Sequence, residues 1–182
     1  MQRYRQHGAA LITSLVILLI LTVLGISAMG TSSMEEIMTG NLRDQLVSFQ
    51  STETALLDSE QEIGAWLSGG SPVPDAAGSN GVFSMDTFIA AYGDYASNAF
   101  DDLNVWSKGT YYGTATGKPL LADVANQPVY IIEEVQFKPQ SDDADAGRHR
   151  IGGTMFYRVT AKGTGVSANS VTLLQTTVAK KY

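Results

Sequence analysis

The chain of 182 residues carries a formal net charge of −6, so its charge balance does not indicate a general nucleic-acid-binding surface. It contains no cysteine and only two histidines, His7 and His149, which excludes a disulfide framework and a thiolate metal site and leaves little for histidine-based catalysis. The length fits one water-soluble domain behind an apolar opening segment.

An uncharged stretch, residues 8–34, opens the sequence, and its densest part reads LVILLILTVL. An apolar helix of about 20 residues spans the hydrocarbon core of a bilayer. Arg3 and Arg5 precede the stretch, and Glu35 and Glu36 follow it. The positive-inside tendency therefore predicts a cytoplasmic N-terminus and a remainder that crosses the membrane. Three interpretations compete: a cleaved secretory signal, a permanent anchor, and a helix that packs inside an assembly.

The helical pattern continues beyond this stretch, because no proline lies between Gln2 and Ser71 and apolar residues recur mostly at steps of three, four or seven. We predict one helix from about Ala9 to Leu67, apolar all round in its first half and amphipathic in its second. An Ile-Ser-Ala triplet resembles a signal cleavage site, but a cleavable apolar region is shorter, roughly 7–15 residues. The stripe expected to face a core is Met34, Met38, Leu42, Leu46, Phe49, Leu56, Leu57, Ile63 and Leu67.

The strand signals come late in the chain. Residues 128–138, 154–162 and 170–179 are rich in β-forming residues, and their short connections predict an antiparallel meander. Packed on the amphipathic helix, these strands would make an α+β domain: a long N-terminal helix on a C-terminal antiparallel β-sheet. Residues 69–81 are a loop by composition, and residues 86–99 are predicted as a short helix.

One acidic run partly resembles a calcium loop, but it lacks the full ligand spacing and the late glutamate, which favours a solvated loop. It consists of Asp142, Asp143, Asp145 and Gly147. The adjoining basic residues 148–150 either balance these aspartates or bind an acidic partner or DNA.

No catalytic constellation emerges from the sequence, and we expect neither an enzyme nor a metal or cofactor site. Glu133 and Glu134 are neighbours in a predicted strand, so their side chains point to opposite faces and cannot act as a paired acid and base. Trp106, Tyr111 and Tyr112 form either a partner-facing patch or part of the core.

The opening resembles the type IV pilin class, in which a short basic leader ends in glycine and an apolar helix follows. Here the leader MQRYRQHG precedes AALITSLVILLIL. The PilX-type minor pilins are more similar still, with a Glu-Glu pair, a Gly-Asn-x-Arg-Asp motif and a Phe-Gln pair. The matching residues are Glu35-Glu36, Gly40–Asp44 and Phe49-Gln50. The segment FYRVTAKGTGVSANSVTLLQTTV also resembles the final strand pair of that family.

The resemblance implies that prepilin peptidase cuts between Gly8 and Ala9 and that the new N-terminus, Ala9, is methylated. It also implies a division of the chain into a leader, a transmembrane and assembly half of the helix, an amphipathic half, and a globular head. These parts would be residues 1–8, 9–34, 35–68 and 69–182.

Two positions depart from the usual pilin pattern. Most pilins carry glutamate at the fifth mature position, where the resemblance implies that it pairs with the terminal amine of a neighbouring subunit. This chain has Thr13 there. The general secretion protein K pseudopilin, at the tip of type II secretion systems, shares this lack. Either the subunit caps an assembly or the position has drifted to a tolerated polar residue. Gly30 stands where major pilins usually have proline, and with Gly25 it weakens the helix without forcing a kink.

The resemblance therefore implies a minor pilin that primes type IV pilus assembly and sits at or near the tip. Its head would be periplasmic while the helix is in the inner membrane, and the subunit would later join the pilus on the cell surface, which serves adhesion and twitching motility. The implied partners are other minor pilins, the major pilin, prepilin peptidase and, at the tip, an adhesin, with no nucleic acid. The alternatives are a type II secretion pseudopilin and a single-span inner-membrane protein with a periplasmic ligand-binding domain.

Overall fold

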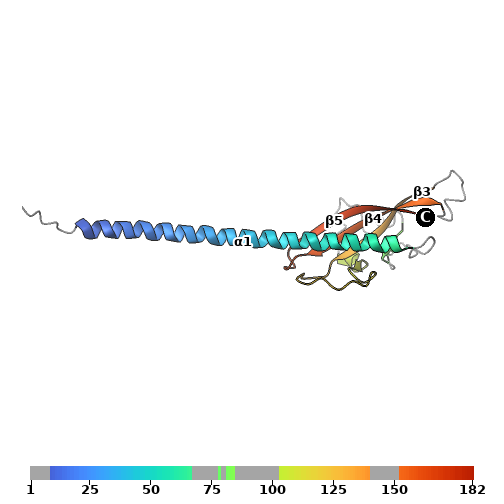
Figure 1. The fold of residues 1–182 in the computed structure, drawn as a ribbon, viewed down its shortest axis with the longest axis horizontal. Coiled ribbons are helices and arrows are strands. Elements are labelled where there is room, and N and C mark those ends of the chain that lie inside the picture. Colours follow the sequence, from blue (N-terminus) through green and yellow to red (C-terminus); the bar gives the residue numbers. More distant parts are fainter. Residues whose placement is uncertain (1–8, 67–77, 79–80, 85–102, 140–151) are drawn as a thin grey trace, which may run out of the picture. The chain divides into compact units, whose positions relative to one another are not determined.

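The computed structural model of the chain describes residues 9–66, 78, 81–84, 103–139 and 152–182. The chain divides into two compact units, Met1–Arg43 and Asp44–Tyr182. Helix α1, Ala9–Ala65, contributes its first part to the first unit and its last part to the second (Figure 1).

In the first unit, every described residue is helical, and the large apolar side chains of this part of α1 are exposed. By length and composition, α1 could cross a membrane, and it is the one described helix for which this holds. Several of its hydroxyl side chains are satisfied within the helix: Thr22, for example, donates a hydrogen bond to the carbonyl of Leu19, at 2.8 Å. Such internal pairing lets polar residues lie in an apolar environment. The predicted long helix is therefore confirmed.

The second unit contains a five-stranded sheet in the order β1-β3-β4-β5, with β2 paired to β3. A short helix, α3 (Leu103–Trp106), precedes β2. The strands are β1 (Val82–Phe83), β2 (Thr110–Tyr111), β3 (Val129–Pro139), β4 (Gly153–Thr164) and β5 (Val171–Lys181). The last three form the antiparallel meander that the sequence predicts. The sequence did not predict β1, which pairs in parallel with β3 and makes the sheet mixed.

The face of α1 that packs on the sheet differs from the prediction. Its buried residues are small and mostly polar: Ser48, Ser51, Thr52, Ala55, Asp58, Ser59 and Ile63. Of the predicted stripe, Ile63 and Leu56 reach the core, whereas Leu46, Phe49 and Leu57 are 61%, 45% and 57% exposed. Met34, Met38 and Leu42 are exposed as well, and Leu67 lies outside the described residues. The predicted stripe is thus largely wrong.

The close approach of the helix to β4 explains this choice of residues. A Cβ atom on Gly163 would lie 2.7 Å from the backbone nitrogen of Thr52 and 2.8 Å from the Ser51 hydroxyl oxygen. The hydroxyls of Ser48 and Thr172 are hydrogen-bonded at 2.6 Å, and Thr52 Oγ1 donates to the carbonyl of Thr172 at 3.2 Å. Leucine-sized side chains would not fit in such a contact, so the large apolar residues turn outward.

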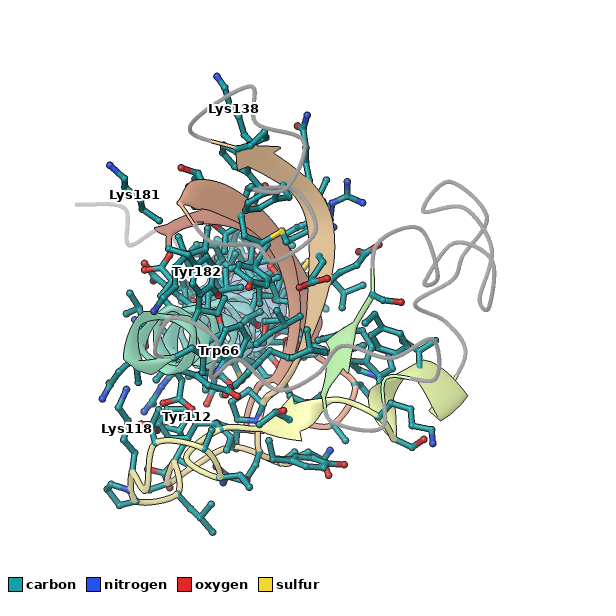
Figure 2. All side chains as sticks on the ribbon, turned by 90° about the vertical axis from the view of Figure 1, so that its right-hand side faces the viewer. Trp66, Tyr112, Lys118, Lys138, Lys181 and Tyr182 are labelled. Carbon is teal, nitrogen blue, oxygen red and sulfur yellow. The ribbon has the colours of Figure 1, made fainter. Side chains whose placement is uncertain are left out.

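Two apolar clusters lie on opposite faces of the sheet, because successive residues of β3 point to alternate faces. Tyr130 and Ile132 pack on the helix side, together with Trp66, which lies beside the end of α1 (Figure 2). The Trp66 ring meets that of Tyr157 edge to face, with the ring centroids 5.3 Å apart. The second cluster consists of Phe83, Val105, Trp106, Val129 and Ile131, so α3 covers that face, to which β1 contributes Phe83. The helix predicted for residues 86–99, the acidic run 142–147 and the basic residues 148–150 lie outside the described residues.

Candidate functional site

The first candidate site is the apolar part of α1, which carries the residues that the pilin resemblance singles out. Ala9 begins the helix, and Gly8 lies outside the described residues. The helix continues through Gly25 and Gly30, where an added Cβ would meet no other atom within 4 Å. This continuity agrees with glycines that loosen a helix without ending it. Their role in assembly remains a prediction.

Thr13 satisfies its own hydroxyl group. Its Oγ1 atom lies 3.0 Å from the carbonyl oxygens of both Ala9 and Ala10, which belong to the preceding helical turn. The side chain is uncharged and already hydrogen-bonded, so it needs no partner from a neighbouring molecule. A glutamate at the same place in an apolar bundle would need a counter-charge.

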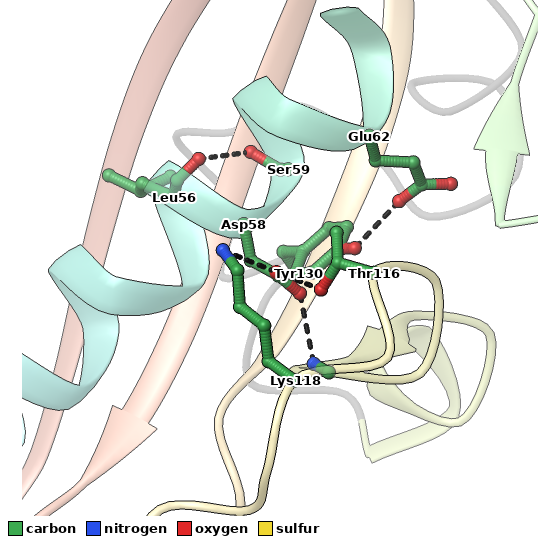
Figure 3. A network of polar contacts seen from close by, with 8 residues as sticks. Leu56, Asp58, Ser59, Glu62, Thr116, Lys118 and Tyr130 are labelled. Atoms are coloured by element: carbon green, nitrogen blue, oxygen red, sulfur yellow. Dashed lines mark hydrogen bonds and ion pairs between the residues drawn. The ribbon is translucent and has the colours of Figure 1, made fainter. Parts of the chain in front are cut away.

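The second candidate site is a polar network on the sheet-facing side of α1, centred on Asp58 (Figure 3). Its carboxylate is fully buried and meets the segment that follows β2. The backbone N–H of Gly113 donates to Oδ2 at 2.9 Å, and the Thr116 hydroxyl donates to Oδ1. Lys118 Nζ lies 3.0 Å from the same Oδ1 atom. We call these four residues the Asp58 clasp, because they join the helix to the segment before β3.

Opposing effects set the pKa of Asp58. Burial alone would raise it, but the hydrogen bonds from Thr116, Gly113 and Lys118 and the charge of Lys118 outweigh burial and lower the pKa from its ordinary value of 3.8. The carboxylate is therefore charged at neutral pH. Because a buried charge is tolerated only when it is paired and hydrogen-bonded, the clasp is a constraint on the head rather than a reactive centre.

A neighbouring contact joins the helix to β3. The Tyr130 hydroxyl donates a hydrogen bond of 2.6 Å to Glu62 Oε2, one helical turn beyond Asp58. Burial raises the pKa of Glu62, and the charge of Asp58 adds to this rise, although the bond from Tyr130 opposes it. Burial and the Glu62 carboxylate also raise the pKa of Tyr130, so its hydroxyl stays protonated as the donor.

The third candidate is a hollow of about 630 Å³ on the sheet face that does not contact α1. Its lining includes the three aromatic residues that the sequence analysis singled out. Trp106 and Tyr112 are buried, whereas Tyr111 is 51% exposed. Lys162 Nζ lies over the Trp106 ring, 5.3 Å from its centroid. The core interpretation is thus confirmed for Trp106 and Tyr112, whereas a partner for the exposed Tyr111 stays a prediction.

The acidic residues of β3 behave as the alternation predicts. Glu133 pairs in register with Arg158 and lies 3.8 Å from it, whereas Glu134 pairs with Tyr157 on the face toward the helix. They therefore cannot act together on one face, as expected. Among the described residues, no group of three or more His, Cys, Asp or Glu side chains could hold a metal ion.

Two protein-family models together match nearly the whole chain. Residues 7–57 match the PilX N-terminal family, and residues 50–180 match the family described as type IV pilus assembly protein PilX C-term. The chain belongs to the PilX family. No curated protein and no solved structure shows significant similarity to it.

The two PilX regions correspond to the structural features above. The N-terminal match covers most of α1, including Thr13, Gly25 and Gly30, and the C-terminal match covers the Asp58 clasp, the sheet and the hollow. As a PilX protein with a membrane-compatible helix, the chain is a minor pilin of a type IV pilus, a membrane-anchored component that interacts with other pilus subunits. PilX proteins are structural components of the pilus rather than enzymes.

Sequence reasoning missed the Asp58 clasp. Asp58 is one of several acidic residues on the helix, and Gly113 and Lys118 lie in a segment with no strong pattern of its own. One signal was available, because Asp58 follows small residues at helical spacing, and a helix face made of small residues can pack closely enough to bury a polar group. The positions Ser51, Ala55, Asp58 and Ser59 have that spacing.

Proposed function

We propose that this minor pilin primes type IV pilus assembly and occupies a position at or near the pilus tip. Prepilin peptidase would cut after Gly8, and the new N-terminus at Ala9 would be methylated while the helix is in the inner membrane and the head is periplasmic. The proposal extends to contacts with other minor pilins, the major pilin and a tip adhesin, and so to adhesion and twitching motility.

One observation carries this proposal: the apolar part of α1 exposes its large side chains, and most of its hydroxyl groups donate to carbonyls of the same helix. Such a helix is compatible with lipid and with a bundle of like helices, so the same residues serve before and after assembly. Because lipid and bundle are equally apolar, the transfer gains little hydrophobic free energy, and shape decides the fit. Ala9, Ala10, Gly25 and Ala28 are the small residues that would permit close helix contacts.

The head supports the same mechanism through the Asp58 clasp. A subunit that is pushed or pulled through its helix must keep its head attached to that helix. The Lys118–Asp58 ion pair and the Tyr130–Glu62 hydrogen bond join two separate segments of the head to successive turns of α1. We infer that these contacts hold the head on the helix when the helix leaves the membrane.

Position at the tip rests on Thr13. A subunit with no neighbour above it gains nothing from a carboxylate aimed at a neighbour's terminal amine. The internal hydrogen bonds of Thr13 agree with this, because they leave no group that requires such a partner.

The test of processing uses the full chain expressed in a piliated host. The Gly8→Val variant should enter the membrane but remain uncut, because the peptidase must accommodate a residue without a side chain before the cut. Gly30→Val, whose added side chain meets open space, is the matched control and should mature normally. Mass spectrometry of the wild-type N-terminus should give methylated Ala9. An intact Met1 in the wild type, or maturation of Gly8→Val to the wild-type mass, would contradict the proposal and favour a plain anchor.

A further inference from the structure

Strand β5 forms one edge of the sheet, and the hydrogen bonds at its two ends establish which backbone groups face outward. The N–H of Gly165 donates to the carbonyl of Ser170 at 2.9 Å, and the N–H of Tyr182 donates to the carbonyl of Gly153 at 2.8 Å. Both bonds involve an even-numbered residue on the β5 side, and the register between β4 and β5 is unbroken. In an antiparallel pair, hydrogen-bonded and non-hydrogen-bonded residues alternate.

The odd-numbered residues of β5 therefore direct their backbone N–H and C=O groups away from β4. They are Val171, Leu173, Gln175, Thr177, Ala179 and Lys181. Among the described residues, no strand pairs with this outer edge of β5. Six residues with outward backbone donors and acceptors are enough to hold a strand of ordinary length.

This edge also lacks the features by which proteins usually protect an edge strand. Residues 171–179 read VTLLQTTVA, with no charge, no proline and no glycine, and no bulge interrupts the pairing of β5 with β4. Exposed edge strands are normally blunted by charges, prolines or bulges, because they would otherwise pair with another chain. Here the first charged residues appear at the very end, at Lys180 and Lys181.

The surroundings of the edge define the chemistry of a strand that would fit it. On one face, Val171 and Leu173 are 48% and 46% exposed. On the other face, Thr52 of α1 lies against β5, and its hydroxyl donates a hydrogen bond of 3.2 Å to the carbonyl of Thr172. A strand laid along β5 would thus have exposed apolar neighbours, Val171 and Leu173, on the face away from α1. At its far end it would meet the exposed Lys181.

We propose that the outer edge of β5 is a docking site for an extended strand of another polypeptide, added antiparallel to the sheet. Backbone hydrogen bonds to the odd-numbered residues would give the affinity, as in other cases of strand addition. The bound strand would carry β-branched or apolar side chains on the face of Val171 and Leu173, and an acidic residue beside Lys181. This surface is separate from the apolar helix and goes beyond the role in pilus priming.

Charge favours a different polypeptide over a second copy of β5. Two antiparallel β5 strands would set Lys181 of each beside Val171 of the other, which leaves both positive charges without an acidic neighbour. A partner with an acidic residue at that end would compensate the charge. Whether a second copy of this chain binds the edge instead can be tested by measuring self-association of the chain.

The test uses the full chain in detergent micelles and a defined probe strand. The probe is an extended segment of about nine residues, a glutamate followed by alternating threonine and valine. A flexible Gly-Ser linker after Tyr182 attaches the probe, which places it at a millimolar effective concentration beside the edge. Because the chain runs toward Lys181 in β5, a probe attached at this end enters antiparallel with its glutamate near Lys181.

Amide hydrogen exchange reports the result. Without the probe, the even-numbered amides of β5 should exchange slowly and those of Leu173, Gln175 and Thr177 quickly. With the probe, exchange at these odd-numbered amides should slow by at least about tenfold. Thr177→Pro removes one outward donor without touching the bonds to β4 and should abolish this protection. Thr177→Val keeps the donor and serves as the matched control.

Three outcomes would overturn the proposal. The odd-numbered amides could exchange as quickly with the probe as without it. The protection could survive in the Thr177→Pro chain. Finally, the chain without a probe could form dimers in sedimentation that Thr177→Pro dissociates and Thr177→Val retains, which would make a second copy the occupant. None of these results bears on cleavage after Gly8, so failure of this proposal is distinguishable from failure of the proposed role in the pilus.

Discussion

Lys118 Nζ lies 3.0 Å from Asp58 Oδ1, and this ion pair joins the segment after β2 to the middle of the sheet-facing side of α1. The Asp58 side chain is fully buried, whereas that of Lys118 is 31% exposed. The aspartate therefore depends on the clasp far more than the lysine does. Asp58 is the point at which we expect the attachment of the head to the helix to be most sensitive.

The first prediction concerns Asp58→Asn. The amide has nearly the same shape but no charge, and in either orientation its NH₂ group faces a donor, because Gly113 donates to one carboxylate oxygen and Thr116 and Lys118 to the other. We expect the free energy of unfolding to fall by about 3 kcal/mol, as when one partner of a buried pair is removed. Urea titration of the full chain in detergent, followed by tryptophan fluorescence, measures this loss. Glu60→Gln, at an exposed position two residues on, should change the free energy by less than about 0.5 kcal/mol. Equal effects of the two substitutions would show that the clasp contributes little.

The second prediction concerns the acid side of the pH profile. Folding lowers the pKa of Asp58 below 3.8, so the unfolded chain binds this proton more readily. The stability that ionised Asp58 contributes is complete above pH 3.8 and is lost as the pH falls through the lower folded value. The difference in unfolding free energy between wild type and Asp58→Asn should therefore be constant near neutral pH and shrink below pH 3.8. A difference that stays constant well below that pH would contradict the lowered pKa.

The third prediction concerns Glu62, for which the sign is reversed. Burial raises its pKa above 4.5, so the folded chain binds this proton more readily than the unfolded chain does. The wild type should gain stability, relative to Glu62→Gln, as the pH falls through the raised value toward 4.5. Glutamine can still accept the bond from Tyr130, which makes it a matched control for the charge. The measurement is the same urea titration at several pH values, and a flat difference between pH 4.5 and 7 would count against the prediction.

The fourth prediction concerns the close contact of α1 with β4. In Gly163→Ala, the new methyl group would lie 2.7 Å from the Thr52 nitrogen, a backbone atom that cannot turn aside. The helix must then move away from the sheet, and we expect a loss of about 2–3 kcal/mol, the upper part of the range for overpacked cores. Gly64→Ala is the contrast, because its methyl group meets open space on a helix. It should leave stability unchanged or raise it by up to about 1 kcal/mol. Comparable losses in the two variants would refute the tight contact.

The fate of the predicted helix stripe shows how far sequence patterns reach. The existence of α1 and of β3, β4 and β5 followed from apolar periodicity and β propensity, which are local properties of the chain. The helix face was assigned wrongly because the pattern method assumes that the largest apolar residues are buried. Here Gly163 and Ala161 bring β4 so near the helix that serine, threonine and alanine fill the interface, and Leu46 and Phe49 face outward.

The remaining features depend on contacts between distant parts of the chain. Strand β1 has only two residues, and it is a strand because it pairs in parallel with Ile132 and Glu133 of β3. No local sequence pattern could therefore predict it. The Asp58 clasp likewise forms only when the segment after β2 brings Lys118 to the helix. In contrast, the opposite orientation of Glu133 and Glu134 followed from strand alternation alone.

The last prediction concerns Thr13 and the proposed position at the tip. Thr13→Glu would place a carboxylate in the apolar part of α1. If a neighbour's terminal amine lies within reach, the charge is compensated. If this subunit has no neighbour above it, the carboxylate stays unpaired, at a cost of several kcal/mol, about 3–5 when a buried pair is incomplete.

The tip position therefore predicts that the Thr13→Glu strain makes fewer surface pili than the wild type, with unchanged protein level and unchanged cleavage after Gly8. Thr13→Gln is the matched control, because it has the same length and polarity without the charge, and it should support near-normal piliation. Counting sheared surface pili from the three strains measures the effect. If position 13 has instead drifted to a tolerated polar residue, the Thr13→Glu strain should make as many surface pili as the wild type, or more. Normal piliation in the Thr13→Glu strain would mean that a compensating amine is present, and hence that another subunit sits above this one in the pilus.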